Sequence, residues 1–86
     1  MPPAPSEIRE AVVEILKDVS RRPIEPTLDS DLIADLGFDS LQVMETITAL
    51  EDRYDISVPA AEAQGARTVA QIVARVDELV RSGSQA

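Results

Sequence analysis

Apolar residues recur at helical spacing in three separate stretches of the chain, and no stretch alternates between apolar and polar residues as a half-buried strand does. The first stretch, residues 6–20, is predicted to be a helix with Ser6 as its N-cap, and Pro23 prevents its continuation. Its apolar positions share one helical face. They are Ile8, Val12, Ile15, Leu16 and Val19.

The second stretch, residues 40–54, contains two apolar rows instead of one. The first row is the expected core stripe and consists of Val43, Ile47, Leu50 and Tyr54. A helix in a small bundle needs only one buried stripe, so the second row is expected to stay exposed beside acidic residues. This second row consists of Leu41, Met44 and Thr48.

The last stretch is predicted to begin with a capping box, in which Thr68 and Gln71 bond reciprocally. Its core positions are again at helical spacing: Val69, Ile72, Val73, Val76, Leu79 and Val80. A short helix over residues 60–64 is expected before it, opened by Pro59 and ended by Gly65.

Residues 21–39 form a long connection whose apolar residues are predicted to pack on the bundle. These residues are Ile24, Leu28, Leu32, Ile33, Leu36 and Phe38. Residues 31–36 are expected to form a short helical turn, with Gly37 as its left-handed stop. The acidic residues of this segment do not make a calcium loop, because Ile33 and Ala34 occupy positions that need an oxygen ligand and a glycine. We therefore predict no metal site.

These elements predict an all-α fold, a small four-helix bundle of three main helices and one short helix, with a long loop between the first and second helices. A chain of 86 residues is long enough for one domain with a modest core. The expected divisions are a flexible N-terminal tail over residues 1–5, a single domain over 6–81 and a flexible C-terminal tail over 82–86.

The chain contains no cysteine and no histidine, and Lys17 is its only lysine. Without histidine there is no Ser-His-Asp triad, and the commonest general base is missing. The composition therefore argues against an independent catalyst, and we expect the protein not to be an enzyme.

The formal net charge is −8, and the charge is concentrated. Residues 25–62 contain ten acidic residues and one basic residue, Arg53. Such a field disfavours nucleic acid and anionic membranes as partners and favours basic proteins. No apolar run approaches the roughly 20 residues of a membrane span, and the first residues lack the pattern of a secretory signal. We expect a cytoplasmic protein.

Ser40 stands at the predicted start of the second helix, within the stretch DLGFDSL. Asp39 and Gln42 fit a capping box, which would leave the Ser40 hydroxyl free at the positive end of the helix dipole. A phosphate group attached there would be favoured. No base in the sequence makes Ser40 a strong nucleophile, so another protein would have to activate it. From spacing alone, the alternative that Ser40 is itself an inert cap stays open.

The stretch DLGFDSL, followed by QVMETITALEDRYDISVP, resembles the acyl carrier proteins and related phosphopantetheine-binding carrier domains. The resemblance covers nearly the whole chain. Within the family, the chain resembles a discrete carrier. It implies that Ser40 receives a 4′-phosphopantetheine arm from coenzyme A through a phosphopantetheinyl transferase. Acyl, polyketide or aminoacyl intermediates would then be carried on the thiol of this arm as thioesters.

The resemblance also assigns roles to the neighbours of Ser40. Asp39 and Leu41 belong to the motif that the transferase recognises. The expected contacts with acyl-transferring, ligase or synthase enzymes that have basic patches are Leu41, Met44, Glu45, Glu51 and Asp52. Such docking would be weak and fast, and the carrier itself is expected to be a monomer.

The chain departs from the pattern of many fatty-acid carriers at Gln42, at Thr46 and in its alanine-rich third helix. We therefore expect a specialised pathway that makes a polyketide, a nonribosomal peptide or a lipid-type metabolite. A housekeeping carrier of fatty acid synthesis is the alternative. An alternative of another class is an unmodified acidic helical adaptor that binds a basic protein.

Overall fold

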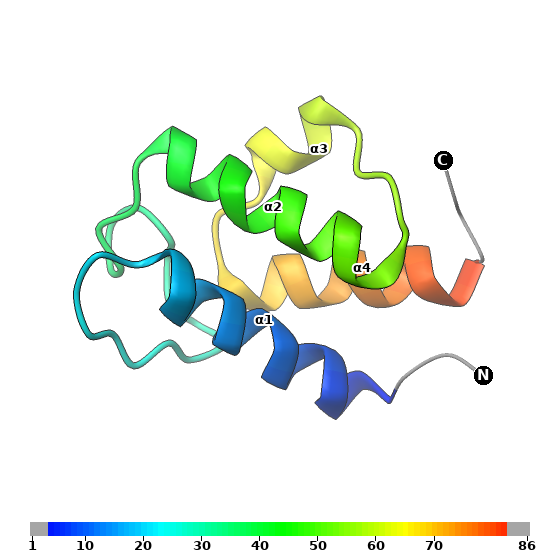
Figure 1. The fold of residues 1–86 in the computed structure, drawn as a ribbon, viewed down its shortest axis with the longest axis horizontal. Coiled ribbons are helices and arrows are strands. Elements are labelled where there is room, and N and C mark those ends of the chain that lie inside the picture. Colours follow the sequence, from blue (N-terminus) through cyan, green and yellow to red (C-terminus); the bar gives the residue numbers. More distant parts are fainter. Residues whose placement is uncertain (1–3, 83–86) are drawn as a thin grey trace.

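The computed structural model describes residues 4–82, which form four helices around one core (Figure 1). The helices are α1 (Pro5–Val19), α2 (Ser40–Tyr54), α3 (Ala60–Gly65) and α4 (Val69–Ser82). Residues 4–82 contain no strand, only an isolated bridge between Asp31 and Thr68. The predicted all-α bundle is confirmed. The helices reach one residue beyond the expected domain at each end, and the other expected tail residues, 1–3 and 83–86, lie outside the described part.

The starts of two helices differ from the expectation. Ser6 is not the N-cap of α1, because the helix begins at Pro5 and its N-cap, Ala4, makes no side-chain capping bond. Proline suits this first position since its ring fixes a helical φ and it has no N–H to satisfy. Pro59 was expected to be the first helical residue of α3, but it is the N-cap and Ala60 begins the helix.

The core lies where α1 packs against α2 and α4, and α3 packs against α2. Figure 1 shows α1 and α2 running in opposite directions, with the long loop joining them at one end of the molecule. The core positions predicted for the three main helices are buried or half-buried. The side chains with the least exposure include Ile8, Leu16, Leu32, Leu50 and Ile72.

The long loop contributes part of this core through Leu32, Leu36 and Phe38, which are all buried. Two of its predicted anchors are wrong, because Leu28 is 39% exposed and Ile33 is 53% exposed. Residues 32–36 form consecutive turns rather than a helix.

The backbone of the same loop caps α4. The N–H groups of Val69 and Ala70 donate to the carbonyl oxygens of Ser30 and Leu28, at 3.1 and 2.9 Å. The first N–H groups of a helix have no partner within it, so these bonds satisfy two of them. The predicted capping box adds a third bond, from the N–H of Gln71 to Thr68 Oγ1 at 3.2 Å. The loop is thus held along the start of α4.

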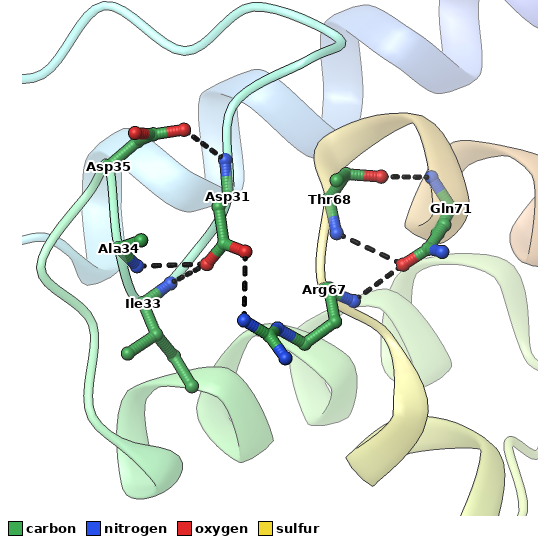
Figure 2. Close-up of polar contacts among 7 residues, drawn as sticks. All are labelled: Asp31, Ile33, Ala34, Asp35, Arg67, Thr68 and Gln71. Carbon is green, nitrogen blue, oxygen red and sulfur yellow. Dashed lines mark hydrogen bonds and ion pairs between the residues drawn. The ribbon is translucent and has the colours of Figure 1, made fainter.

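Asp31 is the centre of this junction (Figure 2). Its Oδ1 accepts hydrogen bonds from the N–H groups of Ile33 and Ala34, at 2.9 and 2.8 Å. Its Oδ2 lies 3.2 Å from Arg67 Nη2 in an ion pair that joins the loop to the segment before α4. These donors and the nearby guanidinium hold the pKa of Asp31 below its ordinary value of 3.8, although partial burial acts in the opposite direction.

Candidate functional site

Ser40 is the first residue of α2, and its neighbour Asp39 is the N-cap. The N–H of Gln42 donates to Asp39 Oδ1 at 2.8 Å, and the N–H of Asp39 donates to Gln42 Oε1 at 3.1 Å. The capping box predicted from the sequence is therefore present. Ser40 is exposed, and its hydroxyl makes no hydrogen bond within residues 4–82. The spare hydroxyl stands at the positive end of the α2 dipole.

The residues before Ser40 fix its place at the surface. Gly37 has a φ of 74°, the left-handed conformation that favours glycine, and its N–H donates to the Ile33 carbonyl at 3.2 Å. The N–H of Phe38 donates to the Leu32 carbonyl at 2.9 Å, and the Phe38 ring is buried. The chain is thus anchored two residues before Ser40, which itself points to solvent.

Gln42 and Thr46, which depart from the pattern of many fatty-acid carriers, are both buried. The Gln42 amide Nε2 donates to the Val19 carbonyl at 3.3 Å, so it ties the first turn of α2 to the end of α1. The Thr46 hydroxyl donates to the Gln42 carbonyl at 2.9 Å. The capping role of Gln42 was predicted from its spacing to Asp39. Its bond to Val19 was not, because a contact between residues 23 positions apart leaves no pattern in the local sequence.

The second apolar row of α2 is exposed as predicted. Leu41 is 61% exposed and Met44 is 37% exposed, and Thr48 is exposed beside them. Ile33 is a further exposed apolar residue, in the turn that precedes Gly37. In Figure 2 its side chain points away from the Asp31 carboxylate. Ile33 was predicted to pack on the bundle, so its place at the surface was missed.

The three predicted acidic docking residues are not equivalent. Glu45 and Asp52 are exposed, and neither carboxylate forms an ion pair with another residue of the 4–82 segment. Glu51 is half-buried, and its Oε2 accepts a hydrogen bond from the Val58 N–H at 2.8 Å. Glu51 therefore also holds the connection between α2 and α3, which a surface role alone would not require.

A hollow of about 380 Å³ lies among α2, α3 and α4. Its lining includes the apolar side chains of Ile47, Ala63 and Ile72. At its rim, Arg75 forms ion pairs with Glu62 at 2.7 Å and with Glu78 at 3.0 Å. The hollow can hold a small apolar group, and the Glu62 pair joins α3 to α4 across it.

Neither a metal site nor a membrane-spanning helix is found in the described part of the chain. Residues 4–82 bring together no group of three acidic, histidine or cysteine side chains that could hold a metal ion. None of the four helices has the length and apolar character needed to cross a membrane.

The model for the family "phosphopantetheine attachment site" matches residues 10–76 of the chain, well over half of its length. The chain belongs to this family of carrier proteins. It is 42% identical over 69 residues to an acyl carrier protein of Amoebophilus asiaticus, which covers 79% of this chain and 86% of the relative. It is 32% identical over 87 residues to a meromycolate extension acyl carrier protein of Mycobacterium tuberculosis, covering 100% and 76%.

The fold is similar to that of a solved carrier as well. The solution structure of the acetyl actinorhodin acyl carrier protein of Streptomyces coelicolor superimposes with a TM-score of 0.69 at 26% identity and covers 95% of each chain. Family membership confirms the carrier role and the phosphopantetheine cofactor expected from the sequence. Members of this family act as carriers for other enzymes and do not catalyse a reaction themselves.

Proposed function

We propose that Ser40 is the residue that bears the 4′-phosphopantetheine group, attached through a phosphodiester bond. One observation carries this assignment: Asp39 caps α2, so the exposed Ser40 hydroxyl has no structural partner within residues 4–82. The N-terminus of α2 favours the negative charge of a phosphodiester at that position. The residues present therefore fit the group, which supplies the thiol on which cargo is held as a thioester.

The chain supplies placement rather than chemistry. It has no histidine and no cysteine, so no side chain of this type lies ready to deprotonate Ser40 or to replace the thiol. The activation of Ser40 is therefore assigned to a phosphopantetheinyl transferase. Asp39 and Leu41 flank the serine and are the residues through which that transferase would recognise the site.

We assign the docking of partner enzymes to the exposed surface of α2. Its apolar part consists of Leu41 and Met44, and its acidic part of Glu45 and Asp52, with Glu51 beside them. Partners of matching chemistry are acyl-transferring, ligase or synthase enzymes with a basic patch. Exposed charges of this kind chiefly raise the association rate, and salt weakens their effect.

We assign the carrier to a specialised pathway whose intermediates are polyketides, peptides or lipid-type chains. The support is that Gln42 and Thr46 are buried and hydrogen-bonded, so these two departures belong to the core of this chain. Two of its relatives are named for actinorhodin and for meromycolate extension. A fatty-acid-synthesis carrier is the alternative, and in either role we expect a monomer that works in the cytoplasm.

The assignment of Ser40 is tested by intact mass after incubation with coenzyme A and a broad-specificity transferase. The wild type and Ser57→Ala, which alters another exposed serine, should each gain one phosphopantetheine. Ser40→Ala should gain none while keeping its helical circular dichroism. If folded wild type stays unmodified with several transferases, or if Ser40→Ala is modified, the assignment is wrong.

A further inference from the structure

Arg22 lies directly against the backbone just before the Ser40 motif. A Cβ atom placed on Gly37 would be 2.6 Å from Arg22 Nη2 and 3.4 Å from Arg22 Cζ. The Arg22 guanidinium therefore lies close to the face of Gly37 that has no side chain. This brings a cation to the acidic Ser40 end of α2 from a position 18 residues earlier in the chain.

Hydrogen bonds at the end of α1 hold the backbone of Arg22 in place. The Ser20 hydroxyl donates to the Arg22 carbonyl at 2.6 Å and accepts from the Arg22 N–H at 3.2 Å. The Gln42 amide donates to the Val19 carbonyl, which fixes the end of α1 on the first turn of α2. The base of the Arg22 side chain is thus anchored relative to Ser40.

The charge of Arg22 is not used by the nearest carboxylates. The ion pairs within residues 4–82 engage Arg53, Arg67, Arg75 and Arg81, but not Arg22. Asp39 Oδ1 accepts the Gln42 N–H, and Asp35 Oδ2 accepts the Asp31 N–H at 2.7 Å. Arg22 is therefore an exposed guanidinium that retains its capacity to bind an anion.

We propose that the Arg22 guanidinium binds the phosphodiester attached to Ser40; this inference rests on the proposed function. Gly37 precedes Ser40 by three residues, which limits the distance between their Cα atoms to about 10–11 Å. The Arg22 guanidinium lies at Gly37, so a change of its side-chain rotamer is enough to bring it to a phosphodiester on Ser40. Arginine binds phosphate oxygens with two parallel N–H donors, and the α2 dipole acts on the same charge.

This bond would fix the direction in which the phosphopantetheine arm leaves Ser40. A phosphodiester bound by Arg22 is drawn toward the end of α1 and the turn at Gly37. The α2 surface of Leu41, Met44 and Glu45 is then left open for partner enzymes while the arm is attached.

The experiment compares apo and holo forms of the wild type, Arg22→Ala, Arg22→Lys and Arg21→Ala. Arg21 is exposed and carries the same charge, but no contact with Gly37 is found for it. Intact mass first establishes that each protein has been converted, so a failure of the Ser40 assignment is recognised at that step. The readouts are the ³¹P shift of the phosphodiester, the Arg22 Nε–H resonance and the melting temperature.

We expect the Arg22 Nε–H resonance to shift when wild-type apo protein becomes holo protein, and the ³¹P shift to change in Arg22→Ala but not in Arg21→Ala. The stabilisation gained on conversion should be smaller in Arg22→Ala by about 2–4 °C, the value for one exposed ion pair in a domain of this size. Arg22→Lys should keep part of the stabilisation that is lost in Arg22→Ala.

Comparing apo with holo forms of each variant removes any effect of the substitution on folding itself. The proposal is overturned if the Nε–H resonance is the same in apo and holo protein. It is also overturned if Arg21→Ala and Arg22→Ala change the ³¹P shift and the gain in melting temperature equally.

Discussion

Besides Asp35, three carboxylates accept hydrogen bonds from backbone N–H groups: those of Asp31, Asp39 and Glu51. Each bond holds a turn or a helix start that lacks its own backbone acceptor there. The fold depends on these bonds, because a backbone N–H loses its acceptor when the carboxylate is removed. The three positions are therefore less replaceable than the exposed Glu45 and Asp52 on the same acidic half of the chain.

Asp31 gives this dependence a pH signature. Its pKa is below 3.8 in the fold, because the Ala34 and Ile33 N–H groups and Arg67 favour its charged form. A carboxyl whose pKa is lowered by folding stabilises the protein above its unfolded pKa, and this stabilisation is lost as the pH falls through the folded pKa. Asp31→Asn should therefore lower the free energy of unfolding at neutral pH.

The measurement is urea unfolding of the wild type and Asp31→Asn between neutral pH and acid. The difference between them should be constant above the ordinary pKa of about 3.8 and should shrink below it. Asp29→Asn is the control, since Asp29 is exposed and no hydrogen bond or ion pair is found for it in residues 4–82. A difference that does not vary with pH would contradict the role of the charge.

Local residue patterns could be read from the sequence, whereas distant pairs could not. The Asp39–Gln42 and Thr68–Gln71 boxes involve residues three apart, so spacing identifies them. Asp31 and Arg67 are separated by 36 positions, and Val19 and Gln42 by 23. Ser6 was misassigned because a serine before an apolar helix is a common cap, whereas this helix begins one residue earlier, at Pro5, after an N-cap, Ala4, without a capping side chain.

Among the elements, the long loop acts as a structural part of the bundle rather than as a simple link. Its buried Leu32 and Phe38 fill the core, and the carbonyls of Ser30 and Leu28 cap α4. A loop tied in this way loses the freedom that its length suggests. The segment that leads into Ser40 is therefore held in position before any partner binds.

Two glycines at element ends should respond in opposite directions to the same change. Gly37→Ala should destabilise the protein by about 1–2 kcal/mol, the cost of a left-handed non-glycine residue, whereas the flexible end of Arg22 can move aside at little cost. A Cβ on Gly65, the last residue of α3, meets no atom within 4 Å, and its φ is not in the left-handed range. Gly65→Ala should therefore stabilise by about 0.4–1 kcal/mol.

Chemical unfolding of both variants under one condition measures the difference. Gly37→Ala should cost nearly the same free energy of unfolding in an Arg22→Ala background, because the cause is the left-handed backbone and not the contact with Arg22. If Gly37→Ala is neutral in the wild-type background, the left-handed turn does not constrain the approach to Ser40 as described.

The elements were predictable because helical periodicity reports which face is buried, and all three main helices follow it. The loop lacks such a period, so apolar character alone could not separate the buried Leu32 and Leu36 from the exposed Leu28 and Ile33. The candidate site was identified from the motif around Ser40. The unequal environments of Glu45 and Glu51 depend on how the α2–α3 connection folds back, which the motif does not encode.

At the scale of the whole molecule, Glu45, Glu51 and Asp52 give α2 a negative surface beyond its first turn, and their effect on partner enzymes should be separable from folding. Glu45→Lys should slow loading by an acyl-transferring enzyme several-fold at low salt and leave the free energy of unfolding nearly unchanged, because Glu45 is exposed. Glu51→Lys should slow loading as well, and it should also lower the free energy of unfolding by about 0.5–1.5 kcal/mol, because the Val58 N–H loses its acceptor.

Loading rates measured across a salt series, together with urea unfolding, test both statements. Glu10→Lys on α1 is the control for net charge, since Glu10 is exposed but lies on another helix. The difference between Glu45→Lys and the wild type should fade as salt rises. Equal loading rates for the wild type, Glu45→Lys, Glu51→Lys and Glu10→Lys at low salt would show that α2 is not the docking surface.

The position of the two helix ends, the start of α1 and the end of α4, has a practical consequence. Figure 1 places the start of α1 and the end of α4 toward one end of the long axis, and the start of α2 toward the other. A fluorophore, an affinity tag or a surface linker joined beside Pro5 or Ser82 would thus be held on the side away from Ser40. The protein can be immobilised by either end and still be offered to soluble enzymes, so that their arrival and departure can be timed one molecule after another.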